Sequence, residues 1–129
     1  MNYLITGGAG FIGLNYLEKM SLKYHNDNFI CFDNLSYASN EKGLRNLINQ
    51  RNNIIFIKGD ITNINDVENV FKNYLIDYVV HFASETHVDR SFYLEDLFYK
   101  TNVEGTKILL DFASEYNVKR FHYVSTDEV

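Results

Sequence analysis

Short, almost continuously apolar runs alternate along the chain with longer segments in which apolar residues recur at helical spacing. Five of these runs are rich in β-branched and aromatic residues and are predicted to be strands: residues 3–6, 29–32, 54–58, 78–83 and 121–124. Strands of a parallel sheet are buried on both faces, so they show continuous apolar runs rather than strict alternation. The pattern therefore predicts an α/β fold built on a parallel sheet.

The segments between the predicted strands are predicted to be helices. The clearest follows the third strand, where apolar residues recur at i, i+3, i+4 and i+7: Val67, Val70, Phe71 and Tyr74. Asn65 and Glu68 have the spacing of a capping box at the start of this helix. Weaker periodicity predicts further helices over residues 11–24, 41–49 and 95–116. This alternation is typical of a doubly wound parallel sheet of the Rossmann type, with strand order 3-2-1-4-5.

Length and composition mainly exclude classes of protein. The 129 residues, 46% apolar and 22% charged, suit one globular domain over residues 1–129. No window holds the 18 or so apolar residues of a membrane span, and the amino terminus lacks the pattern of a secretory signal, so we expect a cytoplasmic protein. A formal charge of −5 leaves no basic stripe for nucleic acid, and no histidine or cysteine spacing indicates a metal site.

A glycine-rich turn lies between the first predicted strand and the first predicted helix. Gly8, Gly10 and Gly13 match G-x-G-x-x-G, and Gly7, Gly10 and Gly13 match the related G-x-x-G-x-x-G. Glycines there let backbone N–H groups approach a pyrophosphate at the positive end of the helix. Asp33 follows twenty residues after Gly13, at the end of the second strand, where a carboxylate can accept both hydroxyls of a ribose. The motif predicts a dinucleotide site that favours NAD over NADP, because the carboxylate repels a 2′-phosphate.

These residues carry a resemblance to a known family, and it covers the chain from Met1 to Val129. The sequence resembles the amino-terminal part of the extended short-chain dehydrogenase/reductases, and among them the dTDP-glucose 4,6-dehydratases. The resemblance rests on residues 6–13, 33–38, 59–61, 81–91, 101–106 and 125–129. The last of these segments is the most specific, since related sugar-nucleotide epimerases carry serine and small residues at that position.

The resemblance implies a site for NAD and for a nucleotide sugar, either dTDP-glucose or UDP-glucose. The implied cofactor contacts follow the successive strand ends: Gly7, Gly10, Phe11, Ile12, Gly13, Asp33, Asn34, Leu35, Ser36, Asp60, Ile61, Phe82, Ala83, Ser84 and Thr101. Thr86 and Thr126 are expected to contact the sugar nucleotide. The implied reaction is an internal redox cycle with elimination of water, in which Asp127 protonates the departing 6-hydroxyl and Glu128 removes the C5 proton.

The Tyr-x-x-x-Lys pair that this family uses to take the proton of the 4-hydroxyl is missing, because no tyrosine of the chain is followed by lysine four residues later. We therefore expect a fragment that lacks the carboxyl-terminal substrate lobe, is inactive alone and forms a homodimer when full length. Two alternatives stay open: a 4-epimerase or decarboxylase of the same superfamily, and a non-catalytic NAD-binding fragment.

Overall fold

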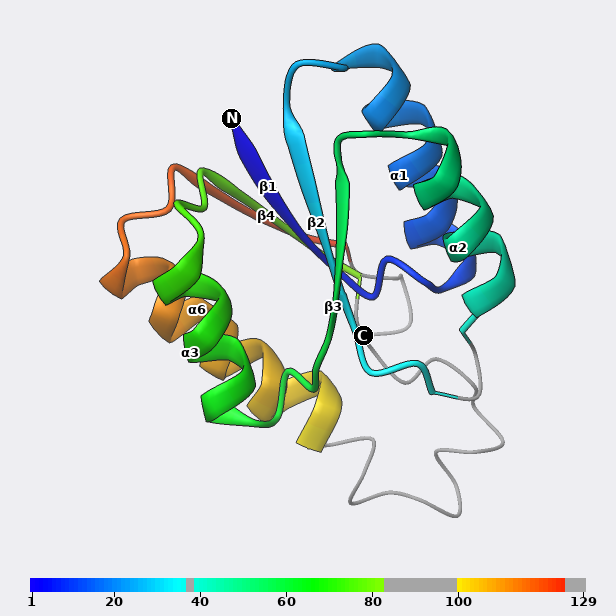
Figure 1. The fold of residues 1–129 in the computed structure, drawn as a ribbon. Helices are drawn as coiled ribbons and strands as arrows, with labels where there is room; N and C mark the ends of the chain where they lie inside the picture. The colour runs from blue at the N-terminus through cyan, green and yellow to red at the C-terminus, as the bar shows by residue number, and fades with distance from the viewer. Residues whose placement is uncertain (37–38, 83–99, 125–129) are drawn as a thin grey trace.

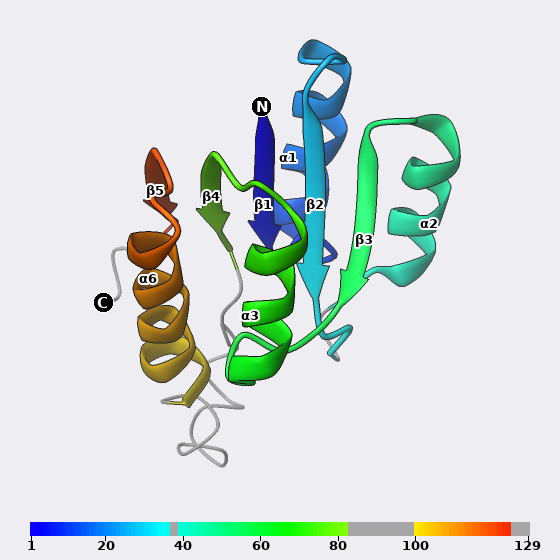
Figure 2. The same ribbon diagram turned by 60° about the vertical axis from the view of Figure 1, so that its left-hand side comes forward.

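The computed structural model describes residues 1–36, 39–82 and 100–124. Its strands are β1 (Asn2–Thr6), β2 (Asn28–Asp33), β3 (Ile54–Lys58), β4 (Tyr78–His81) and β5 (Arg120–Tyr123). They pair in parallel in the order β3-β2-β1-β4-β5 (Figures 1 and 2). The predicted fold class and strand order are therefore confirmed. Phe82, predicted as part of the fourth strand, lies just beyond it, although its N–H still donates to the Thr6 carbonyl at 2.9 Å.

Helices cover both faces of the sheet. They are α1 (Phe11–Lys23), α2 (Glu41–Gln50), α3 (Ile64–Asn73) and α6 (Thr106–Glu115), the last preceded by a π-helix, η1 (Lys100–Gly105). Figure 1 shows α1 and α2 on one face and α3 and α6 on the other. The helix predicted over residues 95–116 is thus found, in its described part, as a π-helix that continues into an α-helix.

The core forms two apolar layers, one on each face of the sheet. The layer under α3 and α6 contains Leu4, Ile30, Phe32, Ile61, Val67, Val70, Phe71, Ile76, Val79, Leu109 and Phe112. The layer under α1 and α2 contains Ile5, Ala9, Leu17, Phe29, Cys31, Leu44, Leu47, Ile54 and Val80. Neighbouring residues of one strand enter opposite layers, because successive side chains of a strand point to opposite faces. This explains why the strands are apolar at consecutive positions.

Two of the helices begin at an asparagine that caps their first turn. The Asn40 side chain accepts the Gly43 N–H at 2.9 Å at the start of α2, and the Asn63 side chain accepts the Asp66 N–H at 3.2 Å at the start of α3. The prediction that Asn65 caps α3 was therefore wrong by two residues. The same Asn-x-x-acid spacing occurs at Asn63, and the Asn63 N–H bonds to the Asp60 carbonyl at 2.9 Å, so the turn after β3 ends there.

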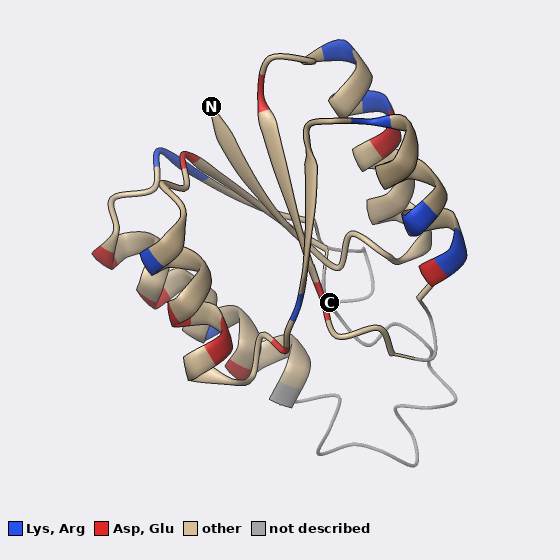
Figure 3. Ribbon diagram, in the orientation of Figure 1, with Lys and Arg blue, Asp and Glu red and all other residues tan. Residues whose placement is uncertain are grey.

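Charged residues leave the middle of the sheet free. Lys, Arg, Asp and Glu lie along the helices and at the ends of strands (Figure 3). The strand positions that carry charge are terminal ones, namely Asp33 at the end of β2, Lys58 at the end of β3 and Arg120 at the start of β5. The side chains in the middle of the sheet therefore pack by apolar contact, and its charged side chains lie at the ends of the strands.

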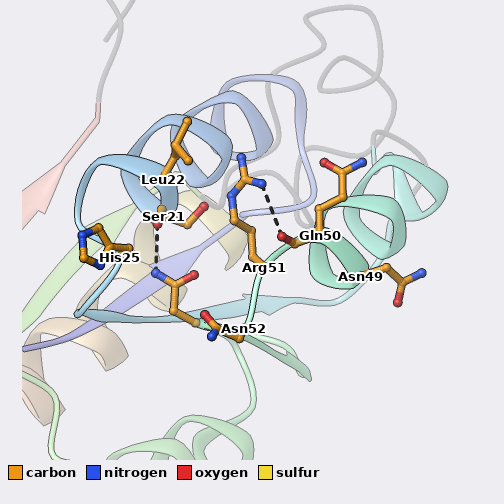
Figure 4. Close-up of a pocket in the computed structure, with 8 residues that line it drawn as sticks. Ser21, Leu22, His25, Asn49, Gln50, Arg51 and Asn52 are labelled. Atoms are coloured by element: carbon orange, nitrogen blue, oxygen red, sulfur yellow. Dashed lines mark hydrogen bonds between the residues drawn. The ribbon is translucent and has the colours of Figure 1, made fainter.

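A polar pocket lies at the edge where the strands begin, between the ends of α1 and α2 (Figure 4). It is built around Asn53, whose side chain is buried and donates to the carbonyl oxygens of Ser21 and Asp27, each at 3.0 Å, and of Tyr24 at 3.4 Å. These bonds satisfy carbonyl groups at and beyond the carboxyl-terminal end of α1. The Asn53 amide therefore fastens the turn between α1 and β2 to the start of β3.

Asn53→Asp is expected to lower the free energy of unfolding by about 2–4 kcal/mol, more than Asn53→Ala at about 1–3 kcal/mol. The aspartate turns a donor into an acceptor that faces three carbonyl oxygens. Urea unfolding measures the loss, and Asn52→Asp at the exposed neighbouring position is the matched control. Equal stability of the two aspartate variants would contradict the role assigned to Asn53.

Candidate functional site

The glycine turn after β1 is shaped by close backbone contacts. Gly7 has a φ of 71°, a left-handed conformation that favours glycine, and its N–H donates to the Phe32 carbonyl at 2.9 Å. The Gly7 carbonyl accepts the Gly10 N–H at 3.1 Å and lies so near Gly13 that a methyl group there would overlap it. Gly7, Gly10 and Gly13 thus bring the start of α1 directly against the end of β1, as the glycine motif predicts.

The amino-terminal end of α1 is the one open helix start among α1, α2 and α3. Gly10 is its N-cap, no side chain caps the N–H groups of its first turn, and no acidic residue lies there. The corresponding turns of α2 and α3 are capped by asparagine and carry an acid. Phe11 and Ile12, in the open turn, are 83% and 61% exposed. Because the N–H groups of a helix start carry partial positive charge, this end can bind an anion.

Asp33 lies beside this helix start with its carboxylate buried, being 7% exposed. Oδ2 accepts the Ala9 N–H at 3.0 Å, while Oδ1 accepts the Leu35 N–H at 2.7 Å and the Ser39 hydroxyl at 3.1 Å. A carboxylate offers about four acceptor positions, so one remains, on Oδ2. The expected pair of ribose hydroxyls would therefore meet a carboxylate with one position left. Ser39 is a partner that sequence reasoning missed.

The loop after β2 is held in a strained form. Leu35 has a φ of 58°, the left-handed region, which costs a branched residue roughly 1–2 kcal/mol. Its N–H is held by Asp33, and the Ser36 N–H donates to the Asn34 side chain at 3.1 Å. Asn34 and Ser36, which follow the end of β2, are exposed to solvent. The loop is therefore preorganised by the same carboxylate that lies next to α1.

The loop after β3 contributes one polar group and one core residue. Asp60 is half-buried, and its Oδ1 accepts both the N–H and the hydroxyl of Thr62, at 2.8 and 2.7 Å. Ile61, also predicted as a cofactor contact, is 4% exposed and packs in the core layer under α3 and α6. A methyl group on Gly105 would collide with the Ile61 side chain, so these two residues meet closely. The Ile61 side chain is therefore core and not available to a ligand.

Two further predicted contacts lie on neighbouring elements. Phe82 is half-buried after β4, with its ring 5.3 Å from that of Tyr16 on α1. Thr101 is half-buried within η1. The predicted residues Ala83, Ser84, Thr86, Thr126, Asp127 and Glu128 lie outside the described residues. Within the described part, the predicted cofactor residues gather at the edge where the parallel strands end, the usual ligand edge of such a sheet.

His81 is a buried polar residue at this edge that sequence reasoning missed. It is fully buried at the end of β4, with Nδ1 2.6 Å from the Thr6 hydroxyl and Nε2 2.8 Å from the Thr106 hydroxyl. Burial lowers its pKa to about 4, from an ordinary value of 6.5. The signal in the sequence was a histidine at the end of an otherwise apolar run.

Stability is expected to fall as the pH drops from 6.5 to 4, by about 3 kcal/mol from His81. Between these pH values His81 is protonated in the unfolded chain but stays neutral in the folded chain. The folding equilibrium therefore shifts toward the unfolded state as the pH falls. The hydrogen bond from the Asn2 N–H lowers the pKa of Asp77 from its ordinary value of 3.8. Asp77 therefore affects stability mainly at pH values below this window. Urea unfolding of wild type, His81→Gln and the exposed His122→Gln measures the effect. An unaltered pH slope in His81→Gln would contradict it.

The described part of the chain shows neither a metal cluster nor a membrane-spanning helix. Residues 1–36, 39–82 and 100–124 contain no group of three His, Cys, Asp or Glu side chains placed to hold a metal ion. No helix among them is long and apolar enough to cross a membrane.

Comparison with known sequences connects this chain to a family. The family model described as GDP-mannose 4,6 dehydratase matches residues 4–129. The protein named dTDP-glucose 4,6-dehydratase of Haemophilus influenzae is 41% identical over 138 residues, which cover 100% of this chain and 40% of the relative. The human dTDP-D-glucose 4,6-dehydratase is 43% identical over 126 residues, covering 98% of this chain and 36% of that protein. The chain therefore spans well under half the length of these relatives.

Solved structures share this fold, and the chain again covers less than half of each of them. A dTDP-glucose 4,6-dehydratase of Bacillus anthracis, in complex with NAD, matches with a TM-score of 0.86 and 39% identity, covering 100% of this chain and 38% of that chain. A UDP-glucose 4-epimerase of Thermotoga maritima, with UDP-glucose, matches with a TM-score of 0.85 and 32% identity over 98% of this chain and 38% of that one. The predicted resemblance is confirmed, and the chain belongs to the family of the GDP-mannose 4,6 dehydratase model.

Proposed function

We propose that the chain is the NAD-binding part of a sugar-nucleotide 4,6-dehydratase acting on dTDP-glucose or UDP-glucose. The observation that carries the proposal is the open amino-terminal end of α1, set against the glycine turn with the Asp33 carboxylate beside it. A dinucleotide presents a pyrophosphate and a ribose at the spacing of such a turn and such a carboxylate. The B. anthracis relative is described in complex with NAD, which supports the choice of cofactor.

The described residues fit this cofactor group by group. The backbone from Gly10 to Gly13 would hold the pyrophosphate, because no side chain or acid competes for the first turn of α1. The open position on Asp33 Oδ2 would accept one ribose hydroxyl. Asp60 would meet the adenine through Oδ2, since Oδ1 is occupied by Thr62. Phe82 would line the nicotinamide side, and Thr101 would contact the cofactor from η1.

Catalysis needs opposed proton transfers at one hexose. Bound NAD would supply a hydride acceptor for C4 and return the hydride to C6. By resemblance we assign Asp127 as the acid for the 6-hydroxyl and Glu128 as the base for the C5 proton. Both follow Val124, whose N–H bonds to the His81 carbonyl at 3.1 Å at the ligand edge of the sheet. Because the chain holds no Tyr-x-x-x-Lys pair, we propose that these 129 residues bind NAD without turnover.

Calorimetric titration of the chain with NAD and NADP tests the proposal. NAD is expected to bind at least about tenfold more tightly than NADP, a difference of about 1.4 kcal/mol that charge repulsion at Asp33 readily supplies. In Asp33→Asn this preference should shrink, because the negative charge is gone. A preference for NADP, or no heat with either nucleotide, would overturn the proposed function.

A 4-epimerase is the second candidate, favoured by the structural match to the T. maritima UDP-glucose 4-epimerase. The two reactions share the first oxidation and differ in the loss of water from C5 and C6. In a protein that carries this chain together with the rest of the relatives' length, a 4-keto-6-deoxy product from dTDP-glucose supports the dehydratase. A 4-epimer that retains its 6-hydroxyl supports the epimerase.

A further inference from the structure

A chain of buried hydrogen bonds crosses the sheet beneath the proposed cofactor edge. His81 on β4 lies between Thr6 on β1 and Thr106 at the start of α6, at 2.6 and 2.8 Å. The Thr106 hydroxyl lies 2.9 Å from the carbonyl oxygen of Asn102, one turn earlier in η1. The bonds thus connect the end of β1 to the π-helix through a single imidazole.

The chemistry of these groups fixes the direction of the two bonds that the Thr106 hydroxyl makes. A carbonyl oxygen can only accept, so the Thr106 hydroxyl must donate its one proton to Asn102. Thr106 therefore accepts from His81, and Nε2 of His81 carries the proton. In a neutral imidazole the other nitrogen is then an acceptor, and the Thr6 hydroxyl donates to Nδ1. The bond from Thr106 to Asn102 thus requires a proton on Nε2 of His81, and a neutral imidazole, which burial favours, completes the network through Thr6.

We propose that His81 is a positioning residue which, through Thr106, fixes the π-helix η1 and so places Thr101 at the cofactor site. The inference rests on the proposed function, because Thr101 is a cofactor contact only if NAD binds at this edge. A π-helix is rare and costs favourable backbone geometry, so it needs outside support of this kind. Gly105 supplies a second support, since it meets the Ile61 side chain at the carboxyl-terminal end of η1, next to Thr106.

Core filling does not explain this residue. The neighbouring inward positions on the same face, Leu4 and Val79, are apolar and fully buried, and an apolar residue at position 81 would satisfy the same layer. A buried imidazole instead costs desolvation that only directed hydrogen bonds offset. Tyr123 stacks on the His81 ring at 5.0 Å, which holds the ring plane in the orientation that both threonines require.

Thr106→Val and Thr106→Ser test the proposal as a matched pair. Valine keeps the shape of threonine but removes both hydrogen bonds, whereas serine keeps the hydroxyl. We expect Thr106→Val to weaken NAD binding by about tenfold and to speed amide exchange across residues 101–105 by about tenfold or more. Thr106→Ser should stay within about twofold of wild type in both. Ser114→Ala, an exposed hydroxyl removed from the same helix, is the control and should change neither.

Nitrogen-15 spectra of the histidine side chains in the wild-type chain give a readout that needs no variant. The His81 ring should be protonated at Nε2 alone from pH 6 to 8, and protonation at Nδ1 would overturn the proposal. Equal NAD affinity of Thr106→Val and wild type would overturn it while leaving the proposed function intact. If the wild-type chain itself does not bind NAD, the proposed function fails. Unchanged amide exchange across residues 101–105 in Thr106→Val would separately overturn the claim that Thr106 fixes η1.

Discussion

Gly13→Ala is expected to lower the free energy of unfolding by about 3 kcal/mol or more and to abolish detectable NAD binding. The added methyl group would overlap the Gly7 carbonyl oxygen, which is backbone and cannot rotate away. The helix α1 would have to move off the end of β1, and the anion site at its first turn would be lost with it. Thermal or urea unfolding and calorimetry measure the two effects.

Gly10→Ala is the matched control for this substitution. A methyl group at Gly10 finds its nearest neighbour, the Gly7 oxygen, at 3.4 Å, and the backbone of Gly10, with a φ of −76°, suits alanine. The variant should therefore melt close to wild type, yet bind NAD more weakly because the methyl group narrows the approach to the helix start. A stable Gly13→Ala with normal NAD affinity would show that helix and strand do not meet as closely as described.

Asp33→Ala is expected to lose about 3 kcal/mol of stability and at least tenfold in NAD affinity. Its carboxylate accepts the N–H groups of Ala9 and Leu35 and the hydroxyl of Ser39, and the first of these donors is buried. Without the acceptor the glycine turn and the strained loop at Leu35 both lose their common anchor. Melting temperature and NAD titration follow the two losses.

Asp33→Asn separates the charge from the hydrogen bonds. Its amide can still accept on one side, so it should retain more stability than alanine while losing the discrimination against NADP. The control is Asp111→Asn, since Asp111 is exposed on α6 and its carboxylate pairs with the exposed Lys107 at 3.0 Å. If Asp33→Ala melts and binds like Asp111→Asn, Asp33 does not organise the site.

The centre of the sheet could be predicted because β1, β2 and β4 are largely buried on both faces. Each strand sends neighbouring residues, such as Leu4 and Ile5, into opposite core layers, and this leaves an unbroken apolar run that is visible in one dimension. The start of α3 was misplaced because the same capping pattern occurs twice, at Asn63 and Asn65. Only the turn held by Asp60 decides between them, and that turn is a contact rather than a pattern.

Some residues of the candidate site could likewise be predicted from local sequence spacing, whereas others depend on tertiary contacts. The turn at Gly13 and the carboxylate of Asp33 follow from local spacing, and the structure brings them together. Ser39 and the His81–Thr106 pair depend on partners that fold beside them, and the last two residues are 25 positions apart in the sequence. The π-helix is equally hidden, because one extra residue per turn over six residues leaves no clear period in the sequence.

Mapping NAD onto a nitrogen-15-labelled sample of the chain by amide chemical shifts tests the proposed site most directly. If NAD binds at the edge where the strands end, the largest shifts fall on residues 7–13 and 33–36. The amides of Ser21 and Asn53, at the opposite edge of the sheet, should stay unchanged and serve as the internal control. Shifts centred on that opposite pocket, or none at saturating NAD, would contradict the assignment of this edge as the NAD site.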